Sequence, residues 1–109
     1  MRVIAVTVLI GVGLSGCAMT LPVRGQIADG SETFTGSATG YADGGGNLTI
    51  SSNRGRTCEG TFVYVNGREG SGTFMCSDGA SGPFNFVSTG TRGTGTGTLA
   101  GKTFTFSFG

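Results

Sequence analysis

The feature that most constrains this chain is a segment in which aromatic residues and glycines are paired about a turn. The stretch from Thr57 to Gly79 reads TCEGTFVYVNGREGSGTFMCSDG. Folded as a β-hairpin about a three-residue loop at 66–68, it places Phe62 opposite Gly72 and Phe74 opposite Gly60. A glycine opposite an aromatic residue leaves room for the ring. Neighbouring registers lose this complementarity, so the sequence predicts a hairpin in one register.

The same register places Cys58 directly opposite Cys76. Two opposed residues of an antiparallel pair have the short Cα separation that a disulfide needs. A redox pair or a metal site is the alternative, but the sequence contains no histidine to complete a structural zinc ligand set. We therefore predict a cross-strand disulfide, which indicates an oxidising compartment.

The sequence also predicts strands on both sides of the hairpin. In residues 31–109, threonine or serine alternates with glycine or phenylalanine with a period of two, which is typical of strands. We expect a first strand from Glu32 to Tyr41 and a second from Asn47 to Ser52. A loop at 53–55 would then set Ile50 opposite Cys58 and Leu48 opposite Gly60.

On the C-terminal side, a loop at Asp78–Ala80 would set Phe74 opposite Phe84 and Gly72 opposite Phe86. After a turn near residues 89–92, glycines alternate with threonines and the last strand alternates phenylalanines with polar residues. The predicted inward residues of these two strands are Gly93, Gly95, Gly97, Leu99, Phe104, Phe106 and Phe108.

The predicted fold is all-β, an antiparallel meander of about seven strands with one cross-strand disulfide. One face carries phenylalanines and the other mostly threonine and serine, and a single open sheet would leave the apolar face in water. Closure into a small barrel, or a strongly curled sheet, buries that face. The 23 glycines permit the curvature.

The N-terminus has the pattern of an export signal. Met1 and Arg2 precede an apolar stretch at 3–13 that is too short to span a membrane, and Leu14-Ser15-Gly16-Cys17 follows. This ending resembles the lipobox of bacterial lipoproteins. The resemblance implies that residues 1–16 are a signal peptide and that Cys17 is acylated. An ordinary secretory signal or a buried helix is the alternative, and neither explains the small residues before the cysteine.

By the same resemblance, Ala18 after the acylated cysteine is typical of lipoproteins sorted to the outer membrane, facing the periplasm. Residues 17–30, interrupted by Pro22, Gly25 and Gly30, predict a tether between the lipid and a domain at 31–109. The whole chain also resembles small Gly/Thr/Phe-rich lipoproteins of Gram-negative bacteria.

The central hairpin further resembles a MORN repeat, a rhythm of glycines and aromatic residues about an NG turn. The matching residues are Gly60, Phe62, Asn66, Gly67, Gly70, Gly72, Phe74, Asp78 and Gly79, whereas Cys58 stands where that family has its leading aromatic residue. The resemblance implies a meander used for interaction.

Composition argues against several chemistries. Histidine is absent, no GxSxG motif occurs, and of the six acidic residues Asp43, Glu69 and Asp78 fall in or beside predicted turns. We predict no catalytic residues, no metal and no cofactor. Without Arg2 the mature chain has equal numbers of basic and acidic residues, which excludes the electrostatic footprint of a nucleic-acid-binding protein.

The outer face carries one candidate contact patch, formed by Val63, Val65, Met75 and Val87. A ladder of Thr94, Thr96 and Thr98 could form a glycan-binding or ice-like surface, but a solvated strand face explains it equally well. Our leading hypothesis is a non-enzymatic lipoprotein, anchored to the membrane through its lipid, with a binding role toward another envelope protein or glycan, or a structural role. The alternative is a hydrolase or inhibitor that acts on envelope polymers.

Overall fold

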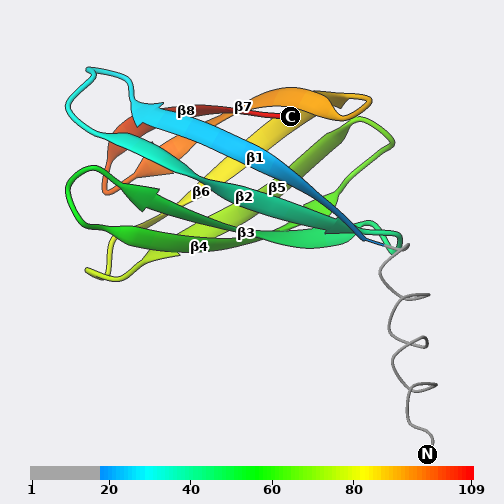
Figure 1. The fold of residues 1–109 in the computed structure, drawn as a ribbon, viewed down its shortest axis with the longest axis horizontal. Helices are drawn as coiled ribbons and strands as arrows, with labels where there is room; N and C mark the ends of the chain where they lie inside the picture. Colours follow the sequence, from blue (N-terminus) through cyan, green and yellow to red (C-terminus); the bar gives the residue numbers. More distant parts are fainter. Residues whose placement is uncertain (1–17) are drawn as a thin grey trace, which may run out of the picture.

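A computed structural model describes residues 18–109, which form an eight-stranded antiparallel barrel (Figure 1). Each strand pairs with the next along the chain, and β1 pairs with β8 to close the barrel. The strands are β1 (Ala18–Ile27), β2 (Thr33–Tyr41), β3 (Gly45–Ser52), β4 (Thr57–Tyr64), β5 (Glu69–Cys76), β6 (Ser81–Thr89), β7 (Arg92–Leu99) and β8 (Lys102–Phe108). No helix within residues 18–109 is long and apolar enough to cross a membrane.

The central hairpin has the predicted register. Cys58 pairs with Cys76, Gly60 with Phe74 and Phe62 with Gly72, and a disulfide joins the two cysteines. The β3–β4 register is also confirmed, since Leu48 pairs with Gly60. In the β7–β8 hairpin, residues predicted to face inward pair glycine with phenylalanine, and Gly93 and Gly95 lie under the rings of Phe108 and Phe106.

The β5–β6 register differs from the prediction. Gly72 pairs with Phe84, and Phe74 pairs with Gly82 rather than with Phe84. The turn lies one residue earlier than expected, because Gly79 takes the left-handed conformation with φ of 89°. The corrected register continues the pairing of glycine with phenylalanine, so that two large rings do not face each other across the hairpin.

The tether prediction for residues 17–30 is wrong from Ala18 to Ile27. This segment is strand β1, which raises the strand count from about seven to eight. Both residues that were expected to interrupt it fit into the sheet. Gly25 lies opposite Phe34 of β2 and Phe106 of β8. Pro22 directly precedes the residues of β1 that pair with β8, and its carbonyl oxygen accepts a hydrogen bond from Gly109 N. A glycine under an aromatic ring and a proline near a strand edge are compatible with a sheet.

The two ends of the barrel differ. The end with the β1–β2, β3–β4, β5–β6 and β7–β8 turns, called the closed end here, is filled by fully buried side chains: Phe34, Phe74, Phe104, Ile50, Leu99 and Cys58. Arg56 lies over the Phe34 ring at 6.0 Å from its centroid and forms an ion pair with the buried Glu32. The most deeply buried side chains therefore lie in this half of the barrel.

Candidate functional site

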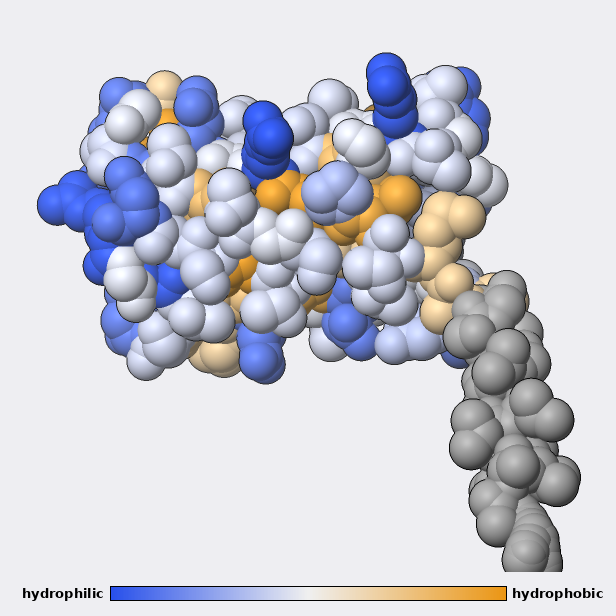
Figure 2. Space-filling model, in the orientation of Figure 1, coloured by the Kyte–Doolittle hydropathy of each residue, from blue (hydrophilic) through white to orange (hydrophobic). Residues whose placement is uncertain are grey.

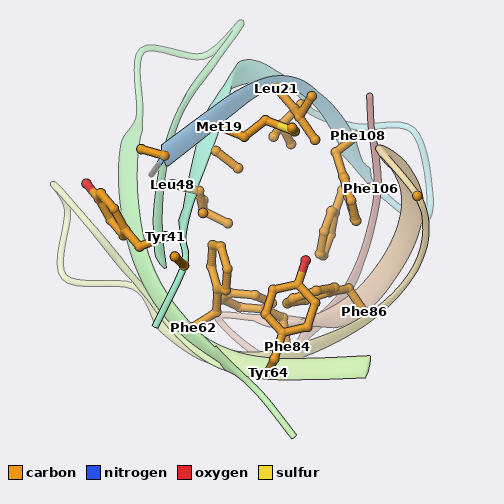
Figure 3. Close-up of a pocket in the computed structure, with 16 residues that line it drawn as sticks. Met19, Leu21, Tyr41, Leu48, Phe62, Tyr64, Phe84, Phe86, Phe106 and Phe108 are labelled. Carbon is orange, nitrogen blue, oxygen red and sulfur yellow. The ribbon is translucent and has the colours of Figure 1, made fainter. Parts of the chain in front are cut away.

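The opposite end, called the open end here, carries an apolar cavity of about 340 Å³ (Figure 3). Strand β1 begins at this end, and the β2–β3, β4–β5 and β6–β7 turns surround it (Figure 1). Of the residues that the structure describes, sixteen line the cavity: Ala18, Met19, Leu21, Val23, Ala38, Gly40, Tyr41, Ala42, Leu48, Phe62, Tyr64, Phe84, Phe86, Gly90, Phe106 and Phe108. This volume lies within the range of small-molecule sites, which is roughly 300 to 1,000 Å³.

The cavity is hollow because its aromatic rings lie along the barrel wall. A Cβ built on Gly70 would stand 2.4 Å from Cζ of Phe86, and one built on Gly95 would stand 2.2 Å from Cζ of Phe106. Each of these rings covers the glycine of a neighbouring strand, so it does not extend across the lumen. The glycines that make the sheet compatible with phenylalanine therefore also keep the centre of the barrel free.

The wall formed by β2 contributes only small side chains. Ala38 and Gly40 face the cavity from this strand, opposite Leu21 and Met19 of β1. A Cβ built on Gly40 would meet no heavy atom within 4 Å, in contrast to the glycines that lie under rings. The free volume is thus bounded by phenylalanines on one side and by small residues on the other.

Two tyrosines lie at the mouth of the cavity. Figure 3 shows the Tyr64 hydroxyl directed toward the lumen, above Phe84 and Phe86, whereas the Tyr41 hydroxyl points away from it. The Tyr64 ring packs edge-on against Phe86, with centroids 5.3 Å apart. Tyr64 therefore places one hydrogen-bonding group at the entrance of an otherwise apolar site.

The lining favours binding of an apolar molecule. None of the sixteen lining residues is acidic, basic, a cysteine, a serine or a threonine, and the tyrosine hydroxyls are the only side-chain oxygens. Apolar pockets with few polar groups are typical of small-molecule sites. The Tyr64 hydroxyl at the mouth can both donate and accept a hydrogen bond, which suits a ligand with an apolar body and a polar end.

Within residues 18–109, the predicted contact residues are exposed but do not form one patch. Val63, Val65 and Val87 lie toward the open end, where Glu69 pairs with Val87. Met75 of β5 pairs with Glu59 of β4 and lies nearer the closed end. The lipidation prediction at Cys17 lies outside the described residues.

Several acidic side chains have local structural roles. Asp43 and Asp78 each accept a hydrogen bond from the backbone N–H two residues on, at 3.0 Å, and Glu69 accepts one from Asn66 Nδ2. These contacts fit the turn roles expected from the sequence.

At the closed end, Arg56 contacts two carboxylates. Its Nε donates to Glu32 Oε2 at 3.1 Å, and its Nη1 lies 3.4 Å from Asp78 Oδ2. The hydrogen bond from Arg56 lowers the pKa of Glu32, against the effect of burial, which raises it. Glu32 is thus held as an anion whose charge is already compensated by the guanidinium above Phe34.

Sequence reasoning missed the cavity residues of β1. Met19 and Leu21 line the cavity, and Val23, Gly25 and Ile27 continue the same inward face toward the closed end. The signal was an alternation of apolar or glycine residues at odd positions from 19 to 27. Pro22 and Gly25 concealed it, because both residues usually interrupt strands.

The fold is similar to that of designed barrels. A redesigned β-barrel, mFAP1, solved with bound DFHBI, superimposes with a TM-score of 0.67 at 15% identity, covering 82% of this chain and 90% of that one. A de novo designed fluorescence-activating β-barrel gives a TM-score of 0.63 at 16% identity, covering 82% of this chain and 88% of that one. Neither a family model nor a curated protein sequence matches the chain. At this level of identity the similarity concerns the all-β barrel fold alone.

Proposed function

We propose that this chain is a non-enzymatic, lipid-anchored barrel of the bacterial cell envelope that binds a small apolar molecule in its open-end cavity. The observation that carries the binding role is the apolar cavity, which is blocked on one side by the filled closed end. Anchoring on the periplasmic side, with sorting to the outer membrane, rests on Leu14-Ser15-Gly16-Cys17 and on Ala18. The Cys58–Cys76 disulfide supports export to an oxidising compartment.

Binding explains the cavity better than catalysis does. General acid–base chemistry needs a titratable group within reach of the substrate, and the sixteen lining residues include only tyrosine hydroxyls. The acidic cluster of Glu32 and Asp78 lies at the other end of the barrel, in contact with Arg56. The open end is therefore suited to holding a molecule without changing it.

Binding can be measured with the dye 1-anilinonaphthalene-8-sulfonate, whose emission rises in apolar surroundings. The sample is residues 17–109 with Cys17→Ser, exported behind an unrelated cleavable secretory signal so that its disulfide forms. We expect saturable binding at one site per chain. Gly40→Phe should abolish it, because the added ring occupies the empty volume beside Met19.

The matched control is Ser37→Phe, which adds the same ring to the exposed outer face of the same strand. This variant should bind the dye as the parent does. Equal loss of binding in both variants, or equal retention, would show that the dye does not occupy the cavity and would refute the proposed role.

A further inference from the structure

We propose that the natural occupant of the cavity is a fatty acyl chain drawn from a lipid of the membrane that the barrel is anchored to. In this arrangement the open end rests on the membrane surface with its mouth toward the lipid. The inference rests on the proposed function, since it takes both the anchor at Cys17 and the binding role of the cavity as given. It adds the class of ligand and the orientation of the barrel.

The first argument is the position of the anchor. Strand β1 begins at Ala18, which lines the cavity and directly follows Cys17 in the sequence. Consecutive Cα atoms are about 3.8 Å apart. Because no tether separates the acylated residue from the barrel, a lipid on Cys17 holds the cavity mouth at the membrane surface.

The second argument is a ring of exposed apolar side chains around the open end, called the rim here. Its members are Met19, Tyr41, Val63, Tyr64, Val65 and Val87. Val65 is 63% exposed, Met19 54% and Tyr41 46%. Exposed apolar clusters mark interaction surfaces, and tyrosine is enriched at the boundary between lipid and water. The rim gives the open end the composition of a surface that meets lipid.

The number of charged residues at each end supports the same orientation. The closed end carries Asp29, Glu32, Arg54, Arg56, Asp78 and Lys102 in or beside its turns. Figure 2 shows the largest group of hydrophilic side chains at the left end of the barrel, which is the closed end in the orientation of Figure 1. The turns of the open end carry four charged residues, Asp43, Glu69, Arg68 and Arg92, against the six of the closed end. Acidic and basic residues balance at each end, so the difference between the ends is that fewer charged groups would lose water at the open end on contact with lipid.

The backbone at the mouth limits how deep the barrel sits. Ala18 to Leu21 pair with β2, but the pairing with β8 covers only Val23 to Ile27. Among residues 18–109, no strand pairs with this second edge of β1 at the mouth, so backbone N–H and C=O groups there have no partner in the sheet. Such groups are not tolerated in the hydrocarbon core, where water is absent. The barrel should accordingly rest at the headgroup level rather than enter the bilayer.

The cavity has the size and polarity that an acyl chain needs. An apolar cavity of about 150 Å³ holds a benzene molecule, so 340 Å³ accommodates roughly a dozen carbon atoms. The Tyr64 hydroxyl at the mouth is placed to bond a carboxyl or ester oxygen. The anchor's own chains are a poorer source, because a single acyl chain binds a membrane only marginally and withdrawing one would weaken attachment.

The first test uses the mature Cys17→Ser chain, which carries no acyl group of its own. Dodecanoic acid and vesicles of phosphatidylethanolamine and phosphatidylglycerol are added separately, and displacement of the bound dye is followed. We expect both to displace it. For the variants, dodecanoic acid binding is measured directly by isothermal titration calorimetry, because Gly40→Phe should not bind the dye. Gly40→Phe and the smaller change Ala38→Leu should each weaken this binding by about tenfold or more, since each removes space for two or more methylenes. Ser37→Phe should leave it unchanged.

The outcomes separate the two proposals. Dye binding in the cavity without displacement by dodecanoic acid or vesicles would overturn the acyl-chain inference and leave the proposed function standing. Displacement by dodecanoic acid but not by vesicles would overturn the membrane as the source. Loss of dye binding altogether would overturn both proposals. Circular dichroism and a free-thiol assay confirm that each variant is folded and disulfide-bonded.

The second test measures orientation on the acylated protein in the same vesicles. An environment-sensitive fluorophore is attached through Val65→Cys on the rim or through Lys102→Cys at the closed end. The emission at position 65 should shift to the blue when vesicles are present, and the emission at 102 should not change. A shift at 102 alone, or the same shift at both positions, would refute the orientation.

Discussion

Gly72 lies directly beneath Phe84. The two residues pair across the β5–β6 hairpin, and a Cβ built on Gly72 would stand 2.8 Å from Cζ of that ring and 2.0 Å from the Thr61 carbonyl oxygen. Phe84 in turn forms part of the cavity lining. One glycine thus connects the register of the sheet with the shape of the site.

Gly72→Val should therefore destabilise the barrel, because the new side chain overlaps Phe84 and the backbone of β4. Overpacking of this kind costs about 1 to 3 kcal/mol. The control is Thr73→Val, which changes an exposed neighbour on the same strand. Strand propensity alone predicts that Gly72→Val stabilises the barrel and that Thr73→Val changes its stability little. Urea unfolding of the two variants decides between these accounts, and a stabilised Gly72→Val variant would show that the contact is not restrictive.

Reduction of Cys58–Cys76 should lower the free energy of unfolding by roughly 2 to 5 kcal/mol, the usual range for a native disulfide in a small exported domain. The bond closes a loop whose ends are 18 residues apart, and its loss restores freedom to the unfolded chain. Urea titrations with and without a reducing agent measure the difference. The Cys58→Ala, Cys76→Ala double variant should match the reduced protein and should not respond to the reducing agent.

Acid should weaken the closed end through Glu32. Because Arg56 lowers the pKa of Glu32 in the folded state, the unfolded chain takes up the proton first as the pH falls. The stabilisation is fully present above the ordinary value of 4.5 and is lost as the pH falls through the folded-state pKa. Glu32→Gln should cost roughly 2 kcal/mol at neutral pH and remove this part of the acid dependence.

The measurement is urea unfolding at a series of pH values from about 6 down to 3. The control is Glu59→Gln, which removes an exposed carboxylate outside the Arg56 cluster. Its acid dependence should stay close to that of the parent. If Glu32→Gln lost stability toward acid as steeply as the parent, the Glu32–Arg56 pair would not be its source.

Cys17→Ser should leave the protein unanchored or its precursor unprocessed, because the substitution removes the sulfur that the lipobox resemblance assigns to acylation. Membrane fractionation and the mass of the processed chain measure the effect. Thr20→Ser, a conservative change outside the lipobox, should fractionate with the parent. Unchanged fractionation and unchanged mass of the Cys17→Ser chain would contradict lipidation.

The parts of the fold that were predictable are those in which local constraints coincide. In the β4–β5 hairpin, two cysteines and two glycine–aromatic pairs select the same register, and the structure has it. At the β5–β6 turn, only loop length was available, and the position of Gly79 within the turn decided the register. A constraint that involves side chains on both strands is stronger than one that involves the turn alone.

Strand β1 and the cavity were less accessible. The partners of β1 are β2 and β8, and its place in the sheet becomes evident only when the barrel closes. The cavity depends on closure as well, since Ala38 and Gly40 become one wall of a lumen only when the phenylalanines of β6 and β8 lie across from them. Pattern along the chain indicates which residues point inward, but not how much space they leave.

Closure through β1 also has a consequence for the order of folding. Strands β2 to β8 can form by adding one hairpin after another, with short loops between partners. The pairing of β1 with β8 joins Val23 to Phe108, near opposite ends of the described chain. Contacts of such large sequence separation carry a loop-closure cost and form slowly.

In a chain that crosses a membrane N-terminus first, β1 emerges earliest, yet it has to wait for β8 before its second edge is paired. Until then the unpaired edge of β1 is exposed to aggregation, and attachment at the membrane surface would hold it apart from other copies while the remaining strands arrive.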